Sequence, residues 1–221
     1  MLILALETSG EICSVALSEG PELLSVLRFR HERRLSERMP ILVDALLKDR
    51  QVALTDIQGI AVGRGPGSFT GVRVAVTMAK VWGLALEVPV IGVSSLDALV
   101  EPYAPMACGA VAAVTPTRRT ESIVAYYQAG MANPVGEPTV VPDEEVVGRA
   151  EAAIPDERLR FVLGENASRI PLPGQTNRIR CLTASSAADA VARLAWLRFV
   201  REDTDNTDTL EPLYVAPSPV G

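Results

Sequence analysis

The sequence predicts an α/β protein with mixed β-sheets flanked by helices. Three observations indicate this class. Short apolar segments at the start of the chain are separated by turns of only a few residues, which is typical of antiparallel strands. Long apolar helical segments then alternate with short strands, as in crossover connections between parallel strands. The second half follows the same order more loosely, although no repeat is visible in the sequence.

The first half begins with three predicted strands in an antiparallel meander. The turns Thr8-Ser9-Gly10 and Glu19-Gly20-Pro21 are rich in residues that break strands. A helix capped by Ser36 is then expected to run to about Asp49, with Pro40 close to its first turn, where a missing N–H costs least. The three strands are Leu2–Leu6, Cys13–Ser18 and Leu23–Phe29.

Further elements complete a ribonuclease-H-like unit of three strands, helix, strand, helix and strand. They are a strand at Gly59–Val62, a helix from Thr70 to about Glu87, a strand at Val90–Val93 and a helix capped by Ser94 or Ser95. Prolines at 102 and 105 predict a boundary, which gives domains 1–101 and 102–221.

The second domain is expected to repeat this unit. Its predicted elements are a hairpin of Gly109–Val114 and Ser122–Gln128 around the turn Thr115–Glu121, helices at Asp143–Ala153 and Ser185–Phe199, and strands at Phe161–Leu163 and Leu213–Val215. Glu202–Glu211 is polar and acidic, which predicts a surface loop.

Composition excludes several classes of function. The 221 residues are 48% hydrophobic and carry a net charge of −6, which argues against a broad electrostatic grip on nucleic acid. Cys13, Cys108 and Cys181 are odd in number and widely spaced, which predicts reduced thiols in a cytoplasmic protein. The apolar start lacks a basic region and is interrupted by Glu7, so we expect no secretory signal and no membrane span.

The most informative segment is the Gly-rich loop Gly63–Val74, which reads GRGPGSFTGVRV between a strand and a long helix. Glycine suits positive φ or the close approach of another backbone, and Ser68 or Thr70 can cap the helix. The loop fits either a phosphate or a tightly docked chain. It is neither a P-loop nor a dinucleotide fingerprint, because the Lys-Ser/Thr pair and the glycine spacing are absent.

The two long helices of the first half are unusually apolar. The first has one apolar stripe, and the second is apolar around nearly its whole circumference, broken only by Arg73, Thr77 and Lys80. Such a helix is either central to its own domain or partly covered by a second protein chain, and the flanking charges favour the second chain. The stripe of the first helix consists of Met39, Leu42, Val43 and Leu46.

Three segments resemble the TsaB (YeaZ) family, namely Leu4–Ser9, Gly63–Arg73 and Pro212–Val215. Leu35–Leu42 is similar to the first interface helix of that family. The resemblance covers nearly the whole chain. It implies two actin-like (ASKHA), ribonuclease-H-like subdomains.

The resemblance also implies a non-catalytic subunit. Family members support TsaD, which transfers a threonylcarbamoyl group to adenosine 37 of tRNAs reading ANN codons. The implied partners are TsaD, the ATPase TsaE, a second copy when TsaD is absent, and tRNA through the complex. ATP is used by the complex, and we expect this chain alone to bind no cofactor and no metal.

The predicted partner interface combines the first two helices with the Gly-rich loop. It comprises Leu35, Met39, Leu42, Val43, Leu46, Gly65, Pro66, Gly67, Ser68, Phe69, Thr70, Val72, Arg73, Val76 and Lys80. Glu7, Thr8 and Ser9 correspond to a remnant of the phosphate turn of actin-like proteins. Two positions depart from the family pattern. Glu7 replaces the common Asp, and Pro116 replaces an acid in the turn Thr115–Arg119, which leaves the role of that turn open.

The main alternative is an autonomous, kinase-like, ATP-dependent enzyme of the actin-like superfamily. Glu7–Gly10 retains only a trace of the Asp-x-Gly turn of such enzymes, and Gly164–Ala167 is a weak candidate for their later Gly-rich loop. A nuclease would need clustered carboxylates, of which Glu7 and Asp44 would supply two of an incomplete set.

Two smaller features of the sequence bear on ligand binding. His31 is the only histidine, so a histidine pair for a metal cannot form. The basic run Arg30–Arg34 suits either contact with tRNA phosphates or a solvated loop.

Overall fold

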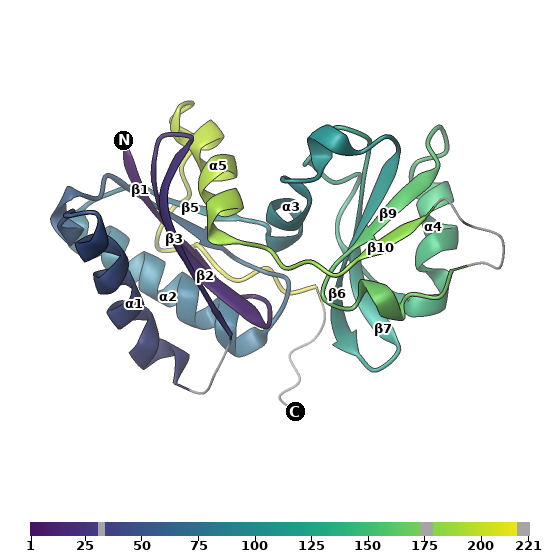
Figure 1. The fold of residues 1–221 in the computed structure, drawn as a ribbon, viewed down its shortest axis with the longest axis horizontal. Coiled ribbons are helices and arrows are strands. Elements are labelled where there is room, and N and C mark those ends of the chain that lie inside the picture. Colours follow the sequence, from purple (N-terminus) through teal and green to yellow (C-terminus); the bar gives the residue numbers. More distant parts are fainter. Residues whose placement is uncertain (31–33, 173–178, 216–221) are drawn as a thin grey trace. The chain divides into compact units, whose positions relative to one another are not determined.

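The computed structural model describes residues 1–30, 34–172 and 179–215 and divides the chain into two compact units (Figure 1). The first comprises Met1–Ala98 and Ser186–Leu213, and the second is built from Leu99–Ser185. The sequence-based division put Ser186–Leu213 in the wrong unit. The reason is the helix α5 (Ala188–Phe199), whose alanine-rich face packs on the first sheet.

The first sheet has the strand order β3-β2-β1-β4-β5. Its strands are β1 (Leu2–Glu7), β2 (Ile12–Glu19), β3 (Glu22–Arg30), β4 (Gly59–Gly63) and β5 (Val90–Val93). The antiparallel meander of β1, β2 and β3 is confirmed, and β4 and β5 run parallel to β1. Because parallel strands end at one edge, this arrangement puts Glu7 beside Gly63.

Helices cover both faces of this sheet, with α1 (Leu35–Asp49) and α2 (Phe69–Leu86) on one face and α5 on the other (Figure 1). The predicted cap at Ser36 is wrong, because Arg34 in a left-handed conformation precedes α1 without a side-chain cap. Ser68 caps α2 by accepting the N–H of Gly71, whereas Thr70 lies inside the helix.

The second unit repeats the topology of the first, with the order β10-β9-β6-β7-β8. Its strands are β6 (Ala110–Arg118), β7 (Glu121–Tyr127), β8 (Thr139–Pro142), β9 (Leu159–Leu163) and β10 (Arg180–Leu182), and α4 (Val146–Ala153) covers one face. The α3 helix (Ser95–Val100) lies where the chain passes between the units, and short 3-10 turns occur at Leu54–Asp56, Ala104–Met106, Asp143–Glu145 and Ala167–Arg169.

Three predictions for the second half are wrong. The expected turn Thr115–Glu121 is mostly strand, because β6 continues to Arg118 through a bulge opposite β7. No strand was expected at β8 or β10, which are short and lie at the two edges of the sheet. Residues 213–215 form no strand and belong to the irregular end of the described chain.

Within the described ranges, α2 is the one helix long and apolar enough to cross a membrane, with a mean hydropathy of 1.3. The sequence predicted no run long and apolar enough for this. A core helix meets the same criterion, and α2 buries six residues against the sheet. Length and composition alone therefore do not indicate a membrane segment here. The six residues are Gly71, Val72, Ala75, Val76, Ala79 and Gly83.

Candidate functional site

The Gly-rich loop packs directly against the turn that follows β1. The N–H of Ser68 donates to the carbonyl of Ser9 at 2.6 Å, and the hydroxyl of Thr8 donates to the carbonyl of Gly71 at 2.7 Å. A Cβ at Gly67 would collide with the Ser9 backbone, so this approach requires glycine. The chain that docks closely on the loop is thus this chain itself, at Thr8 and Ser9 in the turn that follows β1.

Glu7 lies at the centre of this contact and is fully buried. Its carboxylate accepts hydrogen bonds from the N–H of Ser9 at 2.7 Å and from the hydroxyl of Ser95 at 2.8 Å. Ser95 in turn accepts from the N–H of Gly65 at 3.1 Å, which links Glu7 to the loop. A Cβ at Gly63 would collide with the carboxylate.

Burial is the dominant influence on the charge of this carboxyl. It raises the pKa of Glu7, while hydrogen bonds from Ser9, Ser95 and Ser186 act in the opposite direction. The side chain has no exposed surface from which to touch a ligand. In this arrangement Glu7 organises the loop.

Most apolar residues of the predicted interface are buried inside the first unit. Each of the six is at most 4% exposed and belongs to the core between the helices and the sheet. As surface contacts they are therefore wrong, because the apolar stripe of an amphipathic helix faces its own core first. The six are Leu35, Met39, Val43, Leu46, Val72 and Val76.

The rest of the predicted interface is distributed unevenly. Gly65 and Pro66 are buried, Leu42, Ser68, Phe69 and Lys80 are half-buried, and Gly67, Thr70 and Arg73 are exposed. The Arg73 guanidinium lies 5.0 Å from the centre of the Phe69 ring, a cation–π contact. The Lys80 ammonium donates to the carbonyls of Asp208 and Leu210 at 3.0 and 3.2 Å, so it faces this chain's own C-terminal segment.

Other apolar residues of α1 and α2 point outward. Ile41 on α1 is 67% exposed, and Val81 and Leu84 on α2 are 56% and 61% exposed. We call these three residues the outer apolar face. The predicted interface does not include them, although the sequence carries their signal, since Ile41 lies outside the stripe of α1 and α2 is apolar all round.

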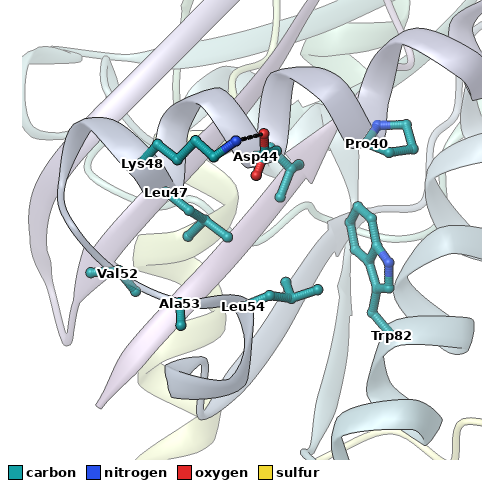
Figure 2. A pocket seen from close by; sticks show the side chains of 9 residues that line it. Pro40, Asp44, Leu47, Lys48, Val52, Ala53, Leu54 and Trp82 are labelled. Carbon is teal, nitrogen blue, oxygen red and sulfur yellow. Dashed lines mark hydrogen bonds and ion pairs between the residues drawn. The ribbon is translucent and has the colours of Figure 1, made fainter.

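A cavity opens between α1, the loop that follows it and the ring of Trp82 on α2 (Figure 2). Its volume is about 380 Å³, and apolar side chains supply most of its lining. The ion pair between Asp44 and Lys48, 2.7 Å long, lies on its α1 side. This hollow is large enough for a bulky apolar group. The other lining residues are Pro40, Val43, Leu47, Val52, Ala53 and Leu54.

The carboxylates that a nuclease would need are not brought together, since Glu7 is buried at the end of the central strand β1 and Asp44 is exposed on α1. The part of the chain that the structure describes contains no group of three or more His, Cys, Asp and Glu suited to a metal. None of the three cysteines, all of which lie in the described ranges, forms a disulfide, and the Cys13 thiol donates to the carbonyl of Gly10 at 3.9 Å.

The basic run before α1 is only partly described. His31 and the two residues after it lie outside the described residues. At its ends, Arg30 pairs with Glu11 at 3.4 Å and Arg34 pairs with Glu37 at 3.8 Å, and all four side chains are largely exposed. These pairs fit the solvated-loop alternative.

In the second unit, Asp143 anchors the hairpin of β6 and β7. It accepts from the hydroxyl of Ser122 at 2.6 Å and from Nε of Arg169 at 2.9 Å. Arg169 also donates to the carbonyl of Arg118 at 3.2 Å. Asn166, from the candidate loop Gly164–Ala167, donates to Ser122 at 2.7 Å. The loop therefore belongs to a network that supports the hairpin.

Comparison with known proteins identifies the family. The model of the TsaD family, described as tRNA N6-adenosine threonylcarbamoyltransferase, matches residues 30–161, more than half of the chain. The structure of YeaZ from Pseudomonas aeruginosa is 31% identical, with a TM-score of 0.80, over 96% of this chain and 99% of that chain. The chain belongs to the TsaB/YeaZ family. The resemblance seen in the sequence is thereby confirmed.

Two curated relatives carry the name tRNA threonylcarbamoyladenosine biosynthesis protein TsaB. The TsaB protein of Escherichia coli (strain K12) is 41% identical over 96 residues, which is 43% of this chain and 41% of that protein. The TsaB protein of Bacillus subtilis (strain 168) is 38% identical over 100 residues, 45% of this chain and 43% of that protein. The chain thus spans less than half the length of the curated relatives it matches.

Proposed function

We propose that this chain is a non-catalytic subunit of threonylcarbamoyladenosine synthesis in the cytoplasm. It binds TsaD and supports transfer of the threonylcarbamoyl group to adenosine 37 of tRNAs that read ANN codons. The full-length likeness to YeaZ is the observation that carries this proposal. The TsaB relatives and the TsaD family model support the same pathway.

The surface for TsaD lies on the outer apolar face of α1 and α2. Its exposed apolar area comes from Ile41, Val81 and Leu84, which lie on the same two helices that line the cavity of Figure 2. Interfaces draw most of their energy from a few such desolvated anchors. Arg73, exposed at the start of α2, supplies a charge at the rim of this surface. The same face closes a homodimer when TsaD is absent.

The remaining partners act through the complex. TsaE joins TsaD and this chain and hydrolyses ATP there, and tRNA is held by the complex as a whole. The packing of the Gly-rich loop on Thr8 and Ser9 supports the absence of a separate nucleotide function for this turn.

The charge-reversing variant Arg73→Glu tests the proposal. Its folding stability should change by about 1 kcal/mol at most, since an exposed cation–π contact contributes little. It should bind TsaD more weakly by calorimetry, and cells that depend on it should make tRNA poor in threonylcarbamoyladenosine by mass spectrometry. Arg158→Glu, an exposed reversal in the second unit, is the matched control.

Unchanged TsaD affinity and normal tRNA modification with Arg73→Glu would contradict the proposed surface. ATP turnover by the purified chain alone, lost in Glu7→Ala, would instead favour the autonomous enzyme. We expect no such turnover, because Glu7 is buried beneath the Gly-rich loop.

A further inference from the structure

The segment after α5 runs across the first unit as an irregular chain, and we call Asp203–Leu213 the C-terminal strap. Its first part is fixed at the edge strand β5. Arg198 of α5 forms ion pairs with Asp203 at 2.8 Å and with Asp205 at 3.0 Å. Asp205 also accepts the N–H of Gly92 at 2.7 Å. The strap therefore starts from a firmly held position.

The middle of the strap is held by α2. The Lys80 ammonium donates to two strap carbonyls, those of Asp208 and Leu210, and the Leu210 side chain is buried in the core beneath. Charge-assisted hydrogen bonds from one cation fix a segment that has no regular structure of its own. Lys80 thus joins a helix of the proposed TsaD surface to the strap.

The end of the strap reaches the Gly-rich loop. The N–H of Leu213 donates to the carbonyl of Arg64 at 2.6 Å. Arg64 is the first residue after β4, and its own N–H donates to the carbonyl of Val93 at 2.9 Å. One continuous segment therefore connects β5, α2 and the start of the loop.

We propose that the C-terminal strap holds the Gly-rich loop in place, with Lys80 and Leu213 as positioning residues. The part of this inference that concerns TsaD rests on the proposed function, whereas the holding of the loop does not. If the strap only covered the core through Leu210, removing the hydrogen bonds that the strap forms with Lys80 and Arg64 would leave the protection of the loop unchanged. The two roles therefore differ in a measurable way.

Hydrogen exchange of the full chain separates them. Lys80→Met removes the ammonium and keeps an apolar stem. Leu213→Pro removes the N–H that donates to the carbonyl of Arg64 together with the leucine side chain, and Leu213→Ala, which loses the side chain and keeps the N–H, is its control. Arg158→Met is the control for loss of one surface charge. We expect the backbone amides of residues 63–71 to exchange about tenfold faster in Lys80→Met and Leu213→Pro, and at an unchanged rate in both controls.

Faster exchange in the strap with an unchanged loop would overturn the proposal, as would equal effects in the controls. TsaD affinity, measured on the same samples, is expected to fall together with loop protection. A loosened loop with full TsaD affinity would contradict the proposed docking role of the loop and leave its holding by the strap supported. Unchanged exchange in the loop together with weakened TsaD binding would overturn the proposal that the strap holds the loop, and would leave the proposed docking surface supported.

Discussion

The contact between Glu7 and Gly63 shows how single residues determine the arrangement of this site. A parallel pairing puts them side by side at the ends of β1 and β4, and only a glycine leaves room for the buried carboxyl. The hydroxyl of Ser95 links this carboxyl to the Gly-rich loop, because it donates to Glu7 and accepts from the N–H of Gly65. The loop is therefore positioned by polar groups that the solvent does not reach.

Gly63→Ala should lower the free energy of unfolding by about 1–3 kcal/mol, because the new methyl group must displace the Glu7 carboxylate. Gly148→Ala is a suitable control, since a Cβ there meets nothing within 4 Å and alanine favours the α4 helix. Urea unfolding measures both variants. Equal free energies of unfolding for the two variants would show that the Glu7 carboxylate can move aside without loss of stability.

Glu7→Gln should change how stability depends on pH. Since burial raises the pKa of Glu7, the folded state binds its proton more tightly, and the associated stability is lost as pH rises through that pKa. The glutamine variant lacks this loss, so its stability relative to the parent should improve from pH 4.5 to pH 8. Urea titrations at both pH values test this, and a difference that does not vary with pH would refute it.

At the scale of elements, α2 has one buried and one exposed apolar face. Val76 is 3% exposed in the core, whereas Val81 lies on the outer apolar face. Val76→Asp should therefore destabilise the first unit by about 3–5 kcal/mol, because it buries an unpaired charge. Thermal unfolding of the purified variant measures this. A folded Val76→Asp variant that only loses TsaD binding would reinstate Val76 as a contact residue.

The elements themselves were predictable where local signals are strong. Apolar segments separated by Gly-containing turns predicted the meander, and the two alternative caps, Ser68 and Thr70, predicted where α2 begins. The faces of α1 and α2 were not predictable from periodicity alone, because a stripe shows that a face is buried without showing by what. Edge strands such as β10, three residues long, carry too little pattern to be recognised.

At the scale of the whole molecule, the two units share one strand order, with β6, β9 and β10 in the places of β1, β4 and β5. A glycine in close contact with the neighbouring strand also occurs in both units. Gly164 after β9 corresponds to Gly63, since a Cβ there would collide with the carbonyl of Val114 on β6. The sequence did not predict that α5 and the strap return to the first unit. Such a long-range contact leaves no mark in local composition.

The central claim is that the outer apolar face binds TsaD, and Val81→Asp tests it most directly. Stability should change little, since Val81 is exposed, and Val135→Asp in the second unit, where the valine is also exposed, is the control. Calorimetry with TsaD should give an affinity at least about tenfold weaker for Val81→Asp and unchanged for the control. Full TsaD affinity in a correctly folded Val81→Asp variant would contradict the account.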